Sequence, residues 1–166
     1  GLVLLPYLDG ERTPDLPHAT GTVGGLTRAN ATPENLARAA FEGMLCGLAD
    51  GVDALRREGL QVSRVLLIGG AAVSKAVQKI AADIFGAPVT VPAPGEYVAL
   101  GAARQAAWAW ATAKGDPEPA PWGRPGTVVH EPAGTSHGDA VRAAYRELRE
   151  TMHPSTRQAA RGSRYW

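Results

Sequence analysis

The chain has 166 residues, of which 45% are apolar and 20% charged, and these values are typical of one globular domain. The formal net charge of +1 gives no reason to expect binding to nucleic acid or to an anionic membrane. The longest apolar runs, such as 65–68, are too short to span a bilayer, and the first residues do not resemble a secretion signal. The single cysteine, Cys46, excludes an internal disulfide and favours a reducing, cytoplasmic location.

The amino-terminal part predicts two short strands. Residues 2–8 form an apolar run typical of a buried strand, and 21–26 alternate small and apolar residues as in a second, glycine-rich strand. Between them, residues 9–17 are dense in charge, glycine and proline, which indicates a surface loop.

A long helix is predicted next. Thr32 supplies the N-cap, Pro33 the first helical position and Glu34 a carboxylate in the first turn, while Gly59 marks the end. Apolar residues recur at spacings of four and three, which predicts an amphipathic stripe at Phe41, Leu45, Leu48, Val52 and Leu55.

The rest of the chain alternates between strands and helices. The pattern predicts a strand at 64–68, a helix at 74–85, a strand at 89–91, and helices at 96–113 and 140–152. This alternation is typical of an α/β fold with a mainly parallel sheet.

Changes in composition along the chain predict its division into a domain and three shorter segments. We expect a domain over 1–113, a proline-rich strap over 114–137, a terminal helix that packs on the domain over 138–153, and a polar tail over 154–166.

A glycine pair follows the predicted strand 64–68. Gly69 and Gly70 stand at its carboxyl end, and a helix begins near Ser74. Glycine lets the backbone turn sharply and approach a ligand, and a helix start offers N–H groups to phosphate or to a polar heterocycle. Ligands collect at the carboxyl ends of strands in α/β sheets. A plain strand-to-helix turn explains the pair equally well, because neither a P-loop nor a Rossmann fingerprint is present.

A second candidate is the segment Pro94-Gly95-Glu96 with small residues at Ala99 and 101–103. The small residues leave room for a flat ligand or for close helix packing, and packing is the simpler interpretation. Glu96 at a helix start is also explained by the helix dipole alone.

The third candidate is the loop 7–14, which contains Asp9, Glu11, Arg12 and Thr13. Two carboxylates two residues apart suit a Mg²⁺ ion or acid–base chemistry. A solvated turn is the commoner explanation of such a run.

Other residue types offer no site. The histidines His18, His130, His137 and His153 are scattered and lack metal-ligand spacing. Trp108 and Trp110 lie two apart on a predicted helix and face different ways, which indicates packing residues.

These signals occur in an order that resembles the carboxyl-terminal domain of the FGGY carbohydrate kinase family. Within the family, Gly-Glu-Arg-Thr-Pro at 10–14 and Ala-Asp-Gly at 49–51 resemble xylulose kinases most. Residues 21–26 and 35–42 are similar to the family signature, the segment from Gly69 to Val89 resembles its adenosine segment, and 96–103 the part that closes it. The resemblance covers residues 2 to about 113.

The resemblance implies an actin-like, ribonuclease-H-like fold in which two domains clasp Mg-ATP and a sugar. This chain would be the second domain, incomplete at its start. The reaction implied is transfer of the γ-phosphoryl group of ATP to the 5-hydroxyl of D-xylulose, which gives xylulose 5-phosphate. Phosphoryl transfer requires mainly positioning and charge stabilisation from the protein.

The family's roles carry over to a few residues. Gly69, Gly70, Ala71 and Ser74 would bind the nucleotide, and the loop with Asp9, Glu11, Arg12 and Thr13 would lie between the domains on the phosphate side. The general base, the sugar pocket, the phosphate loop and most contacts to Mg²⁺ would lie outside this chain. We therefore expect no catalytic residue and no metal ligand within it, and no kinase activity from the chain alone.

Two departures and several alternatives stand beside this interpretation. Ala71 replaces a glycine of many members, and Lys79 stands where a glutamine is common. The sugar could instead be glycerol, gluconate, ribulose or rhamnulose, or the chain could be a non-catalytic nucleotide-binding or assembly module, with a homodimer as an open alternative. An incomplete sheet would leave apolar surface exposed, so we expect association or marginal stability.

Overall fold

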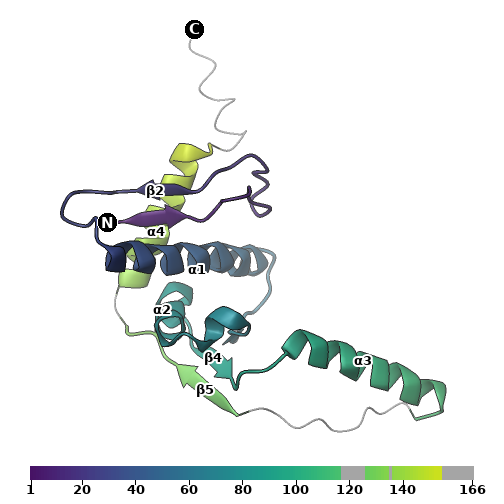
Figure 1. Cartoon of the computed structure of the whole chain (residues 1–166). Coiled ribbons are helices and arrows are strands. Elements are labelled where there is room, and N and C mark those ends of the chain that lie inside the picture. Colours follow the sequence, from purple (N-terminus) through teal and green to yellow (C-terminus); the bar gives the residue numbers. More distant parts are fainter. Residues whose placement is uncertain (117–125, 135, 155–166) are drawn as a thin grey trace.

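The computed structural model describes residues 1–116, 126–134 and 136–154. Its elements lie in layers (Figure 1). Strands β1 (Val3–Leu5) and β2 (Thr22–Gly24) form an antiparallel ribbon on one side of α1 (Pro33–Arg57), and α2 (Lys75–Phe85) lies on the other side. Beyond α2 lies a second sheet with the strand order β3-β4-β5, made of β3 (Val65–Leu66), β4 (Val89–Pro92) and β5 (Thr127–His130).

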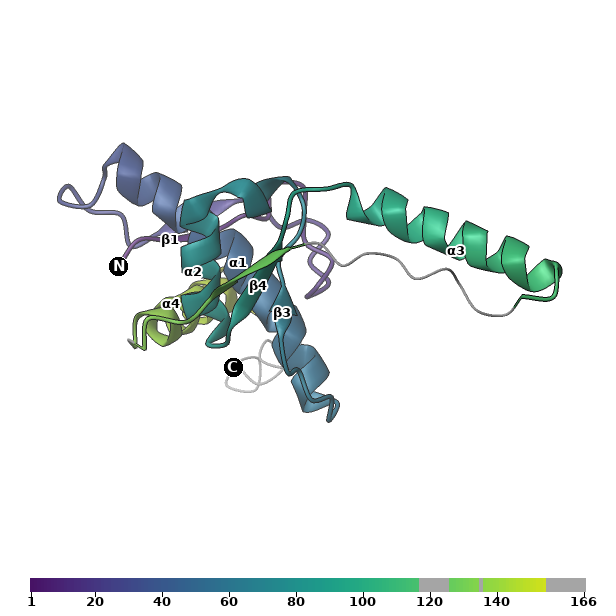
Figure 2. The ribbon, with the colours of Figure 1, turned by 90° about the horizontal axis from the view of Figure 1, so that it is seen from below.

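The two remaining helices differ in how far other elements pack against them. Helix α4 (His137–Met152) crosses the layers and packs against β1, α1 and α2. Helix α3 (Tyr97–Ala113) stands away from the body, and none of its residues is buried (Figures 1 and 2). Within the described residues, no helix combines the length and hydropathy needed to cross a bilayer.

The start of α1 was predicted and is confirmed. The Thr32 hydroxyl accepts a hydrogen bond from the backbone N–H of Asn35 at 3.3 Å, which satisfies one of the free N–H groups at the helix start. At the other end, Gly59 has a φ of 85°, in the left-handed region that favours glycine after a helix.

The predicted apolar stripe of α1 was wrong in part. Leu45 is fully buried, but Leu48 is 54% exposed and Leu55 48% exposed. The buried face consists instead of Leu45 with mostly small residues, namely Ala39, Glu42, Gly43, Cys46 and Ala49. Small side chains let β1 and α2 approach the helix closely. The buried face of α1 is therefore centred on these small residues and not on Leu48 and Leu55.

The sheet also differs from the prediction. The α/β class is confirmed, but among the strands that the structure describes only β3 and β4 pair in parallel, and β5 pairs with β4 in antiparallel. Strand β5 lies within the range expected to be a strap. The amino-terminal strands are also shorter than predicted, because only three residues of each form the ribbon.

One core joins the layers. Its fully buried larger side chains come from the first strand region, three helices and β4, namely Leu5, Tyr7, Leu45, Cys46, Val77, Ile84, Val89 and Tyr145. The carboxylate of Glu42, also buried, contacts Arg38 at 2.7 Å and His137 at 3.1 Å. A charged group is tolerated there because both neighbours satisfy it.

Gly43 lies where α1 meets β1. A Cβ atom at this position would lie 2.1 Å from the Leu4 carbonyl oxygen, so Gly43→Ala would force the helix and the strand apart. We expect this substitution to lower the free energy of unfolding by about 1–3 kcal/mol, the usual range for overpacking. Urea denaturation followed by circular dichroism would measure the change.

Gly51→Ala on the same helix is the matched control, because a Cβ atom there would have no neighbour within 4 Å. We expect it to raise the free energy of unfolding by about 0.5–1 kcal/mol, since alanine favours the helix more than glycine. Equal effects of the two substitutions would contradict the close approach of α1 and β1.

Cys46 generates a second prediction. Burial raises the pKa of its thiol to about 12 from an ordinary 9.0, and the Asp50 carboxylate adds to this effect. At pH 8 we expect a disulfide reagent to modify the native thiol at least about 100-fold more slowly than the thiol of the unfolded chain, because the thiolate is the reactive form. The folded pKa lies above the unfolded one, so the stabilising effect of the protonated thiol is complete below pH 9.0 and declines as the pH rises toward about 12. Equal rates in the native and unfolded states would disprove the burial.

Candidate functional site

A groove lies at the carboxyl ends of β3 and β4. These strands are parallel, so the segments that leave them emerge at the same edge. The segment after β3 turns through Gly69 into the short 3-10 helix η1 (Gly70–Val73), and the segment after β4 leads through Pro94 and Gly95 to α3. The two segments line a groove of about 640 Å³.

The groove is lined mainly by apolar side chains and backbone. Its polar side chains are Gln78 from α2, Glu96 and Tyr97 at the start of α3, and Thr127 from β5. The Tyr97 hydroxyl is already bound to the Ala93 carbonyl oxygen. A mostly apolar lining with a few polar groups is typical of a site for a flat organic ligand.

Gly69 and Gly70 begin the turn after β3, and both line the groove. Gly69 has a φ of 95°, a conformation that strains any residue with a side chain. A Cβ atom at Gly70 would meet no other atom within 4 Å, and Gly70 lines the groove. The predicted glycine pair therefore presents bare backbone to the groove.

Ala71 and Ser74 lie beside the groove but are not among the residues that line it. Ala71 is exposed. The Ser74 hydroxyl accepts a hydrogen bond from the Val77 N–H at 3.5 Å and caps α2. The structure thus brings two of the four predicted nucleotide residues into the groove and places the other two next to it.

Sequence reasoning missed Gln78. Its Nε2 atom donates to the Ala72 carbonyl oxygen at 2.6 Å, so it ties α2 to the turn after β3. It also lines the groove, whereas the sequence pattern singled out its neighbour Lys79. A glutamine one turn into the helix was the available signal, but its contact with the turn is visible only in three dimensions.

Only part of the second predicted segment lies at the groove. Pro94, Gly95 and Glu96 line the groove, whereas Ala99 and the small residues 101–103 lie on the exposed part of α3. Glu96 occupies the N-cap position of α3 and makes no side-chain capping bond.

The predicted loop residues lie elsewhere. The Glu11 carboxylate accepts hydrogen bonds from the N–H groups of Arg12 and Thr13, at 2.7 and 2.9 Å, and so closes its own turn. Asp9 is exposed, and none of these residues lines the groove. Thr13 instead lines a second, wider groove between the loop, α1 and α4.

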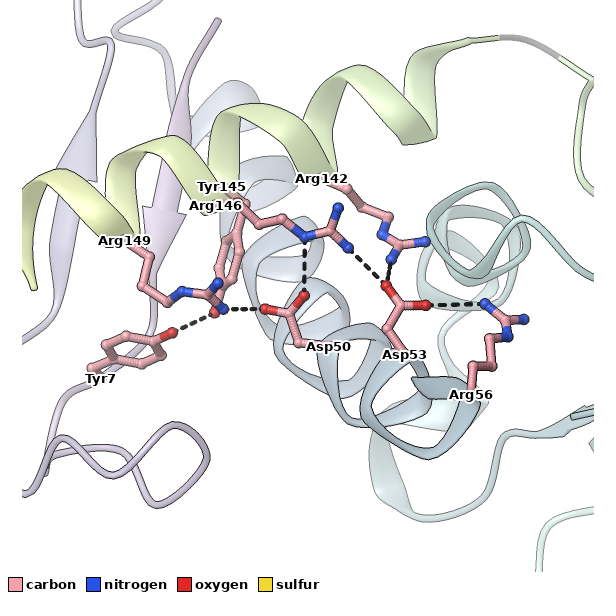
Figure 3. Close-up of polar contacts among 8 residues, drawn as sticks. All are labelled: Tyr7, Asp50, Asp53, Arg56, Arg142, Tyr145, Arg146 and Arg149. Carbon is pink, nitrogen blue, oxygen red and sulfur yellow. Dashed lines mark hydrogen bonds and ion pairs between the residues drawn. The ribbon is translucent and has the colours of Figure 1, made fainter. Parts of the chain in front are cut away.

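The second groove is bordered by an ion-pair network (Figure 3). Asp50 of α1 pairs with Arg146 at 3.3 Å and with Arg149, and Asp53 pairs with Arg142 and, at 2.7 Å, with Arg146. Burial lowers the pKa of Arg149, but the Asp50 carboxylate together with Tyr7 and Tyr145 raises it above its ordinary value. Beside the network, the Tyr145 hydroxyl donates to the Tyr7 hydroxyl at 3.1 Å, and burial raises the pKa of Tyr145 above its ordinary range. The charges satisfy one another, so we interpret this cluster as a clamp that holds α4 on α1.

The groove at the ends of β3 and β4 is therefore the better candidate site. Among the described residues, no group of three or more His, Cys, Asp or Glu side chains is placed to hold a metal ion.

A model of a known protein family matches most of the chain. The model of the FGGY family of carbohydrate kinases, C-terminal domain, matches residues 1–110. This chain belongs to that family. It has the α/β, actin-like fold of the carboxyl-terminal FGGY domain, as the sequence predicted.

The relatives of this FGGY domain include xylulose kinases. That of Haemophilus influenzae is 40% identical over 109 residues, and that of Streptomyces coelicolor 44% identical over 107 residues. The crystal structure of xylulose kinase from Bifidobacterium adolescentis has 48% identity and a TM-score of 0.69, and covers 90% of this chain. A glycerol kinase, from Citrifermentans bemidjiense, is 38% identical over 105 residues.

The chain spans only part of the length of these relatives. The matched parts cover 66% and 64% of this chain but only 22% of the length of each of the two xylulose kinases named by sequence. For the Bifidobacterium structure, the share of that chain is 28%.

The clamp between α1 and α4 can be tested with Asp53→Ala. The side chain of Arg142 is only 13% exposed and would lose its carboxylate partner. We expect the free energy of unfolding to fall by about 2 kcal/mol, as for other hydrogen bonds to charged groups. Arg56→Ala removes a more exposed partner of the same carboxylate and should cost less than about 0.5 kcal/mol. Chemical denaturation of the two variants would measure both values. Similar losses would show that the ion pairs between α1 and α4 stabilise the fold no more than the exposed pair within α1.

Proposed function

We propose that this FGGY domain supplies the adenosine side of the nucleotide site in an ATP-dependent xylulose kinase. The observation that carries the proposal is the groove at the carboxyl ends of β3 and β4, with the bare backbone of Gly69 and Gly70 on one side. Family membership and the xylulose kinase relatives support the reaction type and the sugar.

The chemistry of the groove suits an adenine ring. Its volume of about 640 Å³ lies within the range of small-molecule sites, and the apolar lining suits the faces of a flat base. Gln78, Glu96 and Thr127 offer polar atoms at its border. In this proposal the backbone at Gly69, Gly70 and Ala71 lies against the nucleotide, and Ser74 hydrogen-bonds near the base.

The proposed reaction transfers the γ-phosphoryl group of ATP to the 5-hydroxyl of D-xylulose and gives xylulose 5-phosphate. The protein's main contribution to such a reaction is positioning and charge stabilisation. The general base, the sugar pocket and the groups that hold Mg²⁺ with the phosphates are assigned to the part of the kinase outside this chain. The loop with Asp9, Glu11, Arg12 and Thr13 is assigned to the face between the domains, and the location is cytoplasmic.

Glycerol is the second candidate substrate, because a glycerol kinase is 38% identical over 105 residues. Xylulose is preferred because the xylulose kinases reach 40% and 44% identity. Both substrates leave the role of the adenosine groove unchanged.

Isothermal titration calorimetry with Mg-ADP tests the nucleotide role. We expect the chain to bind Mg-ADP and Gly70→Asp to weaken the affinity at least about tenfold, because a carboxylate there would occupy the groove and repel the phosphates. The substitution does not crowd the backbone, since a Cβ atom at this position has no neighbour within 4 Å.

Ala143→Asp is the matched control, because Ala143 is an exposed residue of α4 and does not line the groove. It should leave the affinity unchanged. Absence of Mg-ADP binding by the unmodified chain, with a cooperative unfolding transition retained, would refute the nucleotide role. Turnover of xylulose by the chain alone would refute the assignment of the catalytic groups to other parts of the kinase.

A further inference from the structure

Gln78 lines the groove with an amide group whose orientation is fixed. Its Nε2 atom donates a hydrogen bond to the Ala72 carbonyl oxygen at 2.6 Å. A carbonyl oxygen only accepts hydrogen bonds, so the amide nitrogen has to face it, and the amide oxygen Oε1 faces the other way. Turning the amide over would bring Oε1 against the Ala72 oxygen, and two acceptors repel each other. The contact with Ala72 therefore leaves Gln78 with one remaining role, that of a hydrogen-bond acceptor.

Oε1 of Gln78 makes no hydrogen bond of its own to any residue that the structure describes. The atom is still within reach of solvent, because the unpartnered polar atoms that are sealed from solvent in the described part of the chain belong to other residues. The side chain as a whole is half-buried. An acceptor in such a place gains more from a ligand's donor group than an acceptor in open water does.

The backbone below this amide is also fixed. Val77 and Ala81, which precede and follow Gln78 on α2, are both 0% exposed. The Gln78 N–H donates to the Ser74 carbonyl oxygen at 3.0 Å, within the first turn of the helix. An acceptor held this firmly is preorganised, so a ligand that offers no donor to it leaves it unpaired and binds less tightly.

The other polar side chains that line the groove set no comparable requirement. Glu96 and Thr127 are exposed, so water competes for their hydrogen bonds. The Tyr97 hydroxyl already donates to the Ala93 carbonyl oxygen. Among the groove-lining side chains of the described residues, Gln78 is therefore the one that can distinguish a donor from an acceptor on a ligand.

The purine bases differ in this respect at position 6 of the ring. Adenine carries an amino group there, which offers N–H donors, whereas guanine and hypoxanthine carry a carbonyl oxygen, which is an acceptor. We propose that Gln78 is a specificity-determining residue, which accepts a hydrogen bond from the 6-amino group of a purine nucleotide and rejects nucleotides with a 6-carbonyl group. The inference rests on the nucleotide role proposed for the groove and names the group that the groove reads.

The contact with Ala72 makes this choice strict. A glutamine that is free to rotate accepts from an amino group or donates to a carbonyl group equally well, because its amide carries both functions. In this structure, donation to a 6-carbonyl group would cost the hydrogen bond to Ala72 and set two acceptor oxygens against each other. The bond that ties α2 to the turn after β3 thereby also sets the preference for the base.

Isothermal titration calorimetry with three nucleotides tests the proposal on the unmodified chain. The probes are the Mg²⁺ complexes of ADP, of purine riboside 5′-diphosphate, which has hydrogen in place of the amino group, and of IDP, which has a carbonyl group there. We expect ADP to bind most tightly, the riboside diphosphate at least about threefold less tightly, and IDP at least about tenfold less tightly. The riboside loses a hydrogen bond, and IDP adds the repulsion between two acceptors.

Gln78→Met removes the amide and keeps a side chain of similar length. We expect the ratio of the affinities for ADP and IDP to fall below about threefold, since a thioether does not distinguish the two groups. Loss of the contact with Ala72 loosens the groove for both nucleotides alike, so the ratio reports the recognition of the base separately from the structural role. Lys79→Met is the matched control, because Lys79 is exposed and does not line the groove, and it should retain the ratio of the unmodified chain.

Several outcomes would overturn the proposal. One is equal affinity of the unmodified chain for ADP and purine riboside diphosphate, a result that does not depend on the folding of any variant. Another is a Gln78→Met variant that keeps the ratio of the unmodified chain. A ratio that is lost in Glu96→Gln but kept in Gln78→Met would assign the recognition to the start of α3. These results leave the nucleotide role intact as long as ADP binds, whereas absence of binding by all three nucleotides would refute the nucleotide role and this inference together.

Discussion

The pairing of Asp50 and Asp53 on α1 with three arginines of α4 holds these two helices, which are far apart in the sequence, against each other. Arg142, Arg146 and Arg149 lie at intervals of four and three residues, so their side chains emerge on one side of the helix toward the two aspartates (Figure 3). At the same contact, Tyr145 reaches the core and hydrogen-bonds Tyr7 next to β1. Exposed ion pairs add little stability one by one, but these are partly shielded, share carboxylates and accompany the burial of a large aromatic side chain.

This contact determines the shape of the body and thereby the place of the groove. With α4 fixed across β1 and α1, helix α2 is held between α1 and the second sheet. Gly138 at the start of α4 lies so close to α2 that a Cβ atom would come within 2.0 Å of the Asp83 carbonyl oxygen. The position of α2 in turn places Gln78 on the turn after β3. The nucleotide role proposed for the groove therefore depends on packing that begins at the far side of the molecule.

The two faces of the domain differ in how far their side chains are covered. The side with α4 is closed, because its three arginines pair with Asp50 and Asp53 and its Tyr145 is buried. The side with α3 is open, because the helix has no buried residue and its apolar side chains face solvent. The groove lies next to the start of α3, because residues 93–97 line it and lead into that helix.

Local signals in the sequence determined where the helices begin and end and which residues could approach a ligand. Thr32 and Pro33 predicted the start of α1, and Gly69, Gly70 and Pro94–Glu96 predicted the two segments that line the groove, because caps and turns depend on a few adjacent residues. The order of these segments also determined the family. Only the tertiary structure decided that Leu48 and Leu55 are exposed, that Thr127–His130 forms a strand, that Gln78 enters the groove and that α3 lacks cover. Burial and strand pairing depend on which distant segment packs against a residue, and periodicity along the chain carries no information about that partner.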